Sequence, residues 1–181
     1  ETLGEWRLQA GYPKRSPDLA IVSHHLDFSI PAELLNSGRR IVSFTTGAAA
    51  SSDRARAFTQ LGIPVIGSGQ TGVDGNRMIE WLSQESGVRV IMMAGGPGIL
   101  ELLLVANRLD IFFNTEVQRE IPVKDPSTFV TVLPGRKKIN RLEEFKITYQ
   151  YIQENVRAED GSHITQFFLR YDRKGLRVDS P

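Results

Sequence analysis

Glycine residues stand at positions 95, 96 and 98, directly after the apolar run Val88–Met93. Without a Cβ atom, a glycine backbone can turn sharply and can let a ligand approach closely. Pro97 suits the first position of a helix, where its missing N–H group is not needed. The free N–H groups and the positive dipole end of a helix that starts near Gly96 would bind a phosphate group. A steric explanation stays open, because tight strand-to-helix turns use glycine for packing as well.

The residues around this turn predict the elements that position it. Val88–Met93 is apolar and rich in β-branched residues, which predicts a strand buried on both faces. Nearly every residue of Ile99–Val105 is apolar, so the predicted helix is enclosed on all sides. Ile111–Phe113 predicts the next strand.

Earlier in the chain, three short apolar runs predict strands: Leu19–Val22, Arg40–Phe44 and Ile63–Ile66. A helix from Asp74 to about Ser86 follows the third run, and Gly87 would end it. The expected fold class is therefore α/β, with a mostly parallel sheet, helices on both faces and one domain over residues 1–181.

Polar residues follow the first two predicted strands. Ser23 and His24 end the first strand, and Thr45 and Thr46 end the second. In open α/β sheets the carboxyl ends of the strands are where ligands bind. A structural explanation is also open, because a hydroxyl or carboxylate in Ser51–Asp53 would cap the helix that follows.

The last third of the chain changes character. Residues 128–133 could form a strand, and the basic segment Pro134–Arg141 could bind phosphate, although a solvated loop is the better interpretation. Apolar residues then alternate with polar ones around a turn in AEDGS, which predicts an antiparallel hairpin. The alternation places two sets on one side of it: Phe145, Ile147, Tyr149 and Tyr151, and Phe167, Leu169 and Tyr171.

Composition excludes several classes of function. Lys and Arg number 22 and Asp and Glu 21, a net charge of +1, which gives no general attraction to nucleic acid or to an anionic membrane. With no cysteine there are no disulfides, thiolate metal sites or cysteine nucleophiles. No apolar stretch approaches the roughly 20 residues of a membrane span. We expect a cytoplasmic protein with neither membrane nor nucleic-acid partners.

The adjacent histidines His24 and His25 raise the question of a metal site. Neighbouring positions on an extended segment point to opposite faces, and the chain holds only one other histidine, His163. We therefore expect no metal here, and interpret the pair as part of a loop beside a ligand or as solvent-exposed residues.

The order of these elements resembles a known family. A strand ending in Ser, a strand ending in Thr-Thr, IPVI, VRVIMMAGGPGIL, LDIFF and a closing hairpin with FLRYDR are similar to the C-terminal reductase domain of the riboflavin-biosynthesis deaminase–reductase, stand-alone pyrimidine reductases included. The resemblance runs from about Pro17 to Arg173. It implies a dihydrofolate-reductase-like fold with an antiparallel C-terminal hairpin, NADPH as cofactor, and a homodimer.

The resemblance also implies a set of cofactor-binding residues. The glycine pair and the helix start would hold the pyrophosphate, Ser23 and His24 would make polar contacts, and Thr45 and Thr46 would lie on the adenosine side. The complete set is Ser23, His24, Thr45, Thr46, Gly95, Gly96, Pro97, Gly98 and Ile99.

Two features depart from the family. Ala94 stands where the family commonly has an acidic residue that faces the substrate, and alanine cannot hydrogen-bond a ribityl or ribose hydroxyl. The family's N-terminal strands, which supply most of the pyrimidine pocket, do not precede Glu1. Either they have been lost, or the chain is not a complete enzyme of this type.

The sequence therefore predicts an NADPH-dependent reductase that reduces a ribosylated aminopyrimidine, a small-molecule substrate, by hydride transfer. No catalytic acid can be nominated, because Asp74 and Glu101 are better interpreted as a helix cap and a helix-surface charge. Two alternatives stay open. One is a non-catalytic nucleotide-binding or assembly module on the same fold, and the other is a dihydrofolate-reductase-like enzyme with another substrate.

Overall fold

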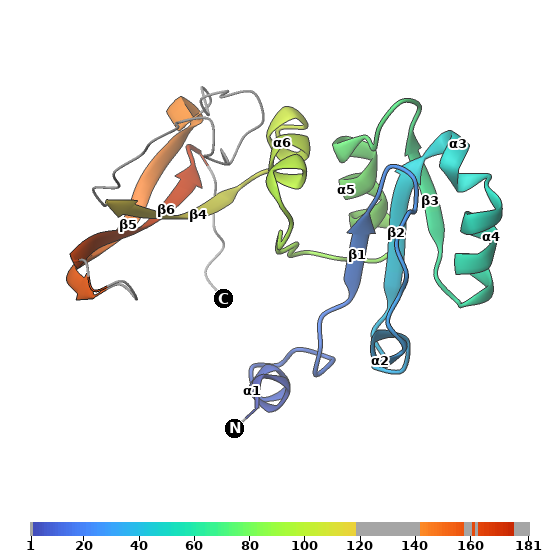
Figure 1. The fold of residues 1–181 in the computed structure, drawn as a ribbon, viewed down its shortest axis with the longest axis horizontal. Helices are drawn as coiled ribbons and strands as arrows, with labels where there is room; N and C mark the ends of the chain where they lie inside the picture. The colour runs from blue at the N-terminus through green and yellow to red at the C-terminus, as the bar shows by residue number, and fades with distance from the viewer. Residues whose placement is uncertain (1, 119–141, 158–160, 162, 176–181) are drawn as a thin grey trace. The chain divides into compact units, whose positions relative to one another are not determined.

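The computed structural model describes residues 2–118, 142–157, 161 and 163–175. The chain divides into two compact units, Glu1–Ile91 and Met92–Pro181, and each is described by itself (Figure 1). The prediction of a single domain over residues 1–181 stays a prediction. Within the described ranges, no helix has the length and apolar character needed to cross a membrane.

The first unit is built on a three-stranded parallel sheet in the order β1-β2-β3. Ser43 marks the register, because it pairs with Ile21 of β1 and with Val65 of β3. The strands and helices of this unit are α1 (Leu3–Gln9), β1 (Leu19–Val22), α2 (Ala32–Leu35), β2 (Ile41–Thr46), α3 (Gly47–Ala50), α4 (Asp53–Gln60), β3 (Val65–Gly69) and α5 (Gly75–Gln84). The three strands predicted here are confirmed, with β3 beginning two residues later than expected.

Helices cover both faces of this sheet, as the sequence predicted (Figure 1). Every residue of the central strand β2 is buried. Ile41 packs in a cluster with Phe58 of α4. Phe44 contacts Trp81 of α5, with the ring centroids 5.5 Å apart. Because side chains alternate along a strand, Ile41 and Phe44 lie on opposite faces, and so do the two helices.

Residues Val88–Met93 do not form the predicted strand, and this prediction is wrong. The segment carries no strand or helix. Val90 is 83% exposed and Met92 88% exposed, so the run is not buried on both faces. The N–H of Val88 donates to the carbonyl of Leu82 and helps to end α5, with Gly87 at φ 63° as expected. An apolar β-branched run predicts extended backbone, but a strand also needs a partner that offers hydrogen bonds.

The second unit is built on a three-stranded antiparallel sheet in the order β4-β6-β5. Its elements are α6 (Pro97–Val105), β4 (Ile111–Gln118), η3 (Leu142–Glu144), β5 (Phe145–Arg157) and β6 (His163–Arg173). The predicted helix and closing hairpin are confirmed, but the helix is not enclosed on all sides: only Leu100 and Leu103 of α6 are buried, and Val105 is 74% exposed. The hairpin does not extend the parallel sheet, because β6 pairs with β4 and β5 alone among the described strands. The predicted strand at 128–133, the basic segment 134–141 and most of AEDGS lie outside the described residues.

Two bulges interrupt the pairing of β5 with β6. The register shifts between Ile147 and Tyr149, and again between Gln153 and Val156. Asn155, inside the second bulge, has a φ of 57°. The first bulge reverses the alternation of side chains between the two faces of the sheet. Ile147 pairs with Tyr171, whereas Tyr149 pairs with Arg170 on the opposite face. The predicted placement of Ile147 and Tyr149 on one face is therefore wrong.

Candidate functional site

The N-terminus of α6 is the best candidate for a ligand-binding site. Gly96 is the N-cap residue in extended backbone, with φ −77° and ψ −170°, and Pro97 begins the helix as predicted. Ile99 N–H donates to the carbonyl of Gly96, and Pro97 has no N–H. Gly98 N–H is therefore the open donor of the first turn, since no side chain in the described part of the chain caps this helix.

The other two long helices begin differently. In α4 the Ser52 hydroxyl accepts from the N–H of Ala55 at 3.2 Å. In α5 the Asp74 carboxylate accepts from Asn76 N–H at 2.9 Å and from Arg77 N–H at 3.1 Å. The structural explanation given for these residues is confirmed. Their donors are occupied, and the charge of Asp74 would repel an anion, so neither start is a phosphate site.

The glycines near α6 differ from those of the first unit in what a side chain would meet. A Cβ atom on Gly69 would stand 2.0 Å from the carbonyl oxygen of Gly72, and one on Gly67 would stand 3.1 Å from the Cα of Gly47. Those two glycines are explained by packing. A Cβ atom on Gly96 or Gly98 would meet no described atom within 4 Å.

Neither Gly96 nor Gly98 has a positive φ, so the backbone does not require glycine at these positions either. Gly72, in the loop before α5, shares both properties. Gly95 is different, because its Cβ would stand 2.6 Å from Cγ1 of Ile99. The steric explanation thus holds for Gly95, whereas Gly96 and Gly98 leave open space in front of the free N–H of the helix.

The predicted residues of the first unit lie together at the carboxyl ends of β1 and β2. Ser23 N–H donates to the carbonyl of Phe44 at 3.0 Å, and its hydroxyl accepts from Leu26 N–H at 3.0 Å. Leu26 is held there at a φ of 58°. Ser23 therefore closes the turn that follows β1, and the exposed His24 ring lies within that turn.

Thr45 and Thr46 are buried and hold the same loops together. The Thr45 hydroxyl donates to the carbonyl of His24 at 3.0 Å, and the Thr46 hydroxyl accepts from Ala49 N–H at 3.2 Å and caps α3. A hydroxyl has one donor and two acceptor sites, so each threonine keeps sites for further hydrogen bonds. In this geometry both threonines shape the strand ends more than they present side chains to a ligand.

Ser68 lies at the same edge and was not among the predicted residues. It is 2% exposed, and its hydroxyl has no hydrogen-bond partner among the described residues. It lies within the register shift at the carboxyl end of β3, between Gly67, which pairs with Thr45, and Gly69, which pairs with Thr46. The rule that placed Thr45 at a strand end would have found Ser68 as well, had β3 been extended past Ile66.

The two adjacent histidines form no metal site in the part of the chain that the structure describes. The rings of His24 and His25 contact each other edge-on, with centroids 4.3 Å apart. Both are exposed. Across the described ranges no three His, Cys, Asp or Glu residues are placed to hold a metal ion. This arrangement fits the interpretation of a solvent-exposed loop.

Gly95–Ile99 belong to the second unit, as does Ala94, which is exposed directly before the glycine pair. The methyl group of Ala94 offers no hydrogen bond to a ligand. The chain matches no protein-family model and no curated protein sequence. The class of protein must therefore be inferred from the fold and from the start of α6.

Proposed function

We propose that this protein is an NADPH-dependent reductase domain that reduces a ribosylated aminopyrimidine by hydride transfer. The observation that carries the proposal is the start of α6, where an open N–H, a positive dipole end and two unobstructed glycines occur together. These features suit a pyrophosphate, which carries negative charge and needs close contact with the backbone.

The residues at this helix start fit the pyrophosphate of NADPH. Gly98 N–H would donate to a phosphate oxygen, and the absence of side chains at Gly96 and Gly98 would let the phosphate approach the helix. Pro97 fixes the backbone of the first turn without offering a competing donor. The side chain of Ile99 packs against the backbone of Gly95 and so supports the turn. When bound, NADPH supplies the hydride, and the protein supplies position and electrostatics.

The assignment of Ser23, His24, Thr45 and Thr46 to the cofactor stays a prediction. The hydrogen bonds of Ser23 and Thr45 support a positioning role, because Ser23 accepts from Leu26 N–H and Thr45 donates to the carbonyl of His24. The exposed ring of His24 is the side chain of this group that can reach a ligand. We assign no catalytic acid.

A second candidate function is a non-catalytic nucleotide-binding module on the same fold. The observation that favours it is Ala94, which is exposed beside the glycine turn and cannot hydrogen-bond a sugar hydroxyl. Such a module would bind the nucleotide at α6 and would leave the substrate unreduced.

Calorimetric titration with NADPH and NADH, followed by a turnover assay, separates these functions. A reductase binds NADPH more tightly than NADH and consumes NADPH when the aminopyrimidine ribose phosphate is added, as measured by the absorbance of the reduced cofactor. Binding without consumption supports the non-catalytic module. Inhibition by a folate analogue would indicate a dihydrofolate-reductase-like enzyme with another substrate. A folded protein that binds neither nucleotide at millimolar concentration contradicts both candidates.

We also propose that the chain forms a homodimer through one face of the antiparallel sheet. Register places Phe113, Tyr149 and Tyr151 on the face that carries Arg170. All three are at least half exposed. The charge of Arg170 is neutralised by its ion pair with Asp172, so Arg170 itself adds no like-charge repulsion between two copies of this face.

Sedimentation at micromolar concentration tests the dimer. The variant Tyr151→Glu places a charge on the proposed interface and should give a monomer near 20.2 kDa. Ile147→Glu is the matched control, because Ile147 is equally exposed but lies on the opposite face. A wild-type protein that sediments as a single monomer contradicts the dimer.

A further inference from the structure

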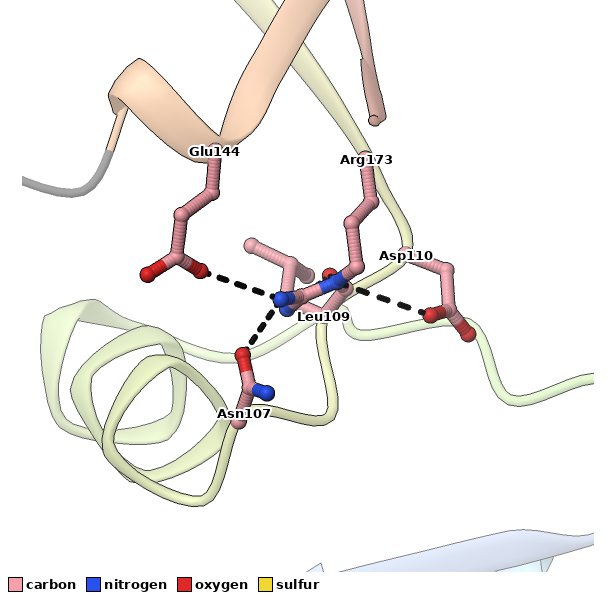
Figure 2. Close-up of polar contacts among 5 residues, drawn as sticks. All are labelled: Asn107, Leu109, Asp110, Glu144 and Arg173. Atoms are coloured by element: carbon pink, nitrogen blue, oxygen red, sulfur yellow. Dashed lines mark hydrogen bonds and ion pairs between the residues drawn. The ribbon is translucent and has the colours of Figure 1, made fainter. Parts of the chain in front are cut away.

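Arg173, the last residue of β6, joins this strand to η3 and to the connection between α6 and β4 (Figure 2). Its Nε and Nη2 donate to the carbonyl oxygen of Leu109 at 2.9 and 2.6 Å. Its Nη1 donates to the carboxylate of Glu144 at 3.1 Å and to the side-chain oxygen of Asn107. Four of the five guanidinium N–H groups are thereby used, and the side chain is only 17% exposed.

Two of these partners lie directly after α6. Asn107 has a φ of 56°, the left-handed conformation that ends many helices. Its N–H donates to the carbonyl of Leu104, and Arg108 N–H donates to that of Leu103, which is the hydrogen-bond pattern of a Schellman motif. Arg173 holds the side chain of the residue on which this helix end depends.

We propose that Arg173 is a positioning residue for the glycine turn. It fixes the C-terminal end of α6 against the sheet, and so sets the direction in which the N-terminus presents Gly96 and Gly98. The inference rests on the proposed function in one respect only, namely that the ligand at this turn is the pyrophosphate of NADPH.

Because α6 is long, a small tilt at its C-terminal end produces a large displacement of its N-terminus. Nine residues at 1.5 Å each give a helix of about 13 Å, so a tilt of about 10° at one end moves the other by about 2 Å. A displacement of about 1 Å is enough to weaken a positioned contact strongly. The C-terminal end therefore has to be held firmly if Gly98 N–H is to stay in place.

Arginine suits this position better than lysine. The carbonyl of Leu109 receives two parallel N–H groups, while Glu144 and Asn107 are reached from the other side of the same planar group. Lysine offers three donors from a single nitrogen and cannot span these partners. The positive charge also lies at the C-terminal end of α6, where it complements the helix dipole.

The test compares Arg173→Lys and Arg173→Met with a matched control on the same strand. Arg170→Lys is that control: Arg170 lies on the opposite face of the sheet from Arg173, and its guanidinium makes a bidentate ion pair with Asp172. We expect the Kd for NADPH to rise about tenfold in Arg173→Lys, further in Arg173→Met, and not at all in Arg170→Lys. The melting temperature should fall in all three.

A second readout needs no ligand. The backbone amide resonances of Gly96 and Gly98 in the free protein should shift in both Arg173 variants and stay unchanged in Arg170→Lys. Failure of the wild type to bind NADPH would overturn the proposed ligand, while these resonances would still decide the positioning role. Unchanged glycine resonances and unchanged affinity in Arg173→Lys, together with a lowered melting temperature, would overturn the inference and leave a stabilising role alone.

Discussion

Substitutions at the glycine turn should separate stability from ligand binding. Gly98 lies at the second position of α6, its φ is not positive, and a Cβ there meets no described atom within 4 Å. Alanine is a better helix former than glycine, so Gly98→Ala should raise the free energy of unfolding by about 0.5–1 kcal/mol. The same methyl group points toward the helix N-terminus, where the phosphate would approach, and should weaken binding.

Gly96→Val is the stronger perturbation of the proposed site. The structure has room for the new side chain, so the fold should be retained. The branched group would keep the pyrophosphate away from the helix N-terminus. Loss of the charge-assisted hydrogen bond from Gly98 N–H would remove about 1.5–3 kcal/mol of binding free energy, which raises the Kd for NADPH about 10- to 150-fold.

Gly95→Ala supplies the contrast, because its Cβ would stand 2.6 Å from Ile99 Cγ1. This variant should lose stability, whereas Gly96→Val should not. Urea unfolding measures the free energies, and calorimetric titration with NADPH measures the affinities. A folded Gly96→Val protein that binds NADPH like the wild type would refute the site. A Gly95→Ala protein as stable as the wild type would refute the steric reasoning.

Three further predictions concern stability. Phe44→Ala should lower the free energy of unfolding by about 3–5 kcal/mol, since Phe44 is fully buried, whereas Met92→Ser on the exposed segment should change it by less than about 0.5 kcal/mol in urea titration. Ser43→Ala should raise it by about 1 kcal/mol, because the buried Ser43 hydroxyl has no partner among the described residues; a decrease would show that the hydroxyl is satisfied. Hydrogen bonds from Arg170 are the largest cause that holds the pKa of Asp172 below its ordinary value of 3.8. The stability they contribute is complete above that pH and is lost as the pH falls through the lower folded value. Arg170→Gln should reduce this loss in acid titrations followed by circular dichroism.

The strands of the first unit could be predicted because each is a short apolar run bounded by turn residues. Ile41–Phe44 is the clearest case, and all of it is buried. The run Val88–Met93 is also short, mostly apolar and rich in β-branched residues, but it forms no strand. The difference lies in the hydrogen-bond partner: β2 has a neighbour on both sides, and apolar composition alone does not report a neighbour.

Side-chain direction in the hairpin could be predicted only as far as the first bulge. Alternation assigns Ile147 and Tyr149 to one face, but the extra residue Thr148 reverses the assignment as far as the second bulge. A bulge depends on the partner strand, so no pattern within β5 reveals it. The dihydrofolate-reductase-like architecture likewise depends on how strands combine into sheets, and it stays a prediction.

Part of the candidate site could be predicted from the residue types alone. Pro97 and the glycines predicted the start of α6 correctly, because proline at the first helical position has a local cause. The difference between Gly95 and Gly96 could not be predicted, since it depends on where the side chain of Ile99 lies. The role of Arg173 could not be predicted either, because its partners Asn107 and Leu109 lie more than sixty residues away in the sequence.

The two bulges of β5 have a consequence for self-association in concentrated solution. β5 is an edge strand of 13 residues whose side chains are nearly all exposed, and a long edge of this kind is a template for the addition of strands from other molecules. The bulges leave Tyr149–Gln153 as the longest regularly paired stretch, and they twist the edge on both sides of it. A second chain adding to this edge would lose register within a few residues, so the bulges act against fibre growth. Removing the bulge at Asn155 by deletion of one residue should therefore increase aggregation of the folded protein.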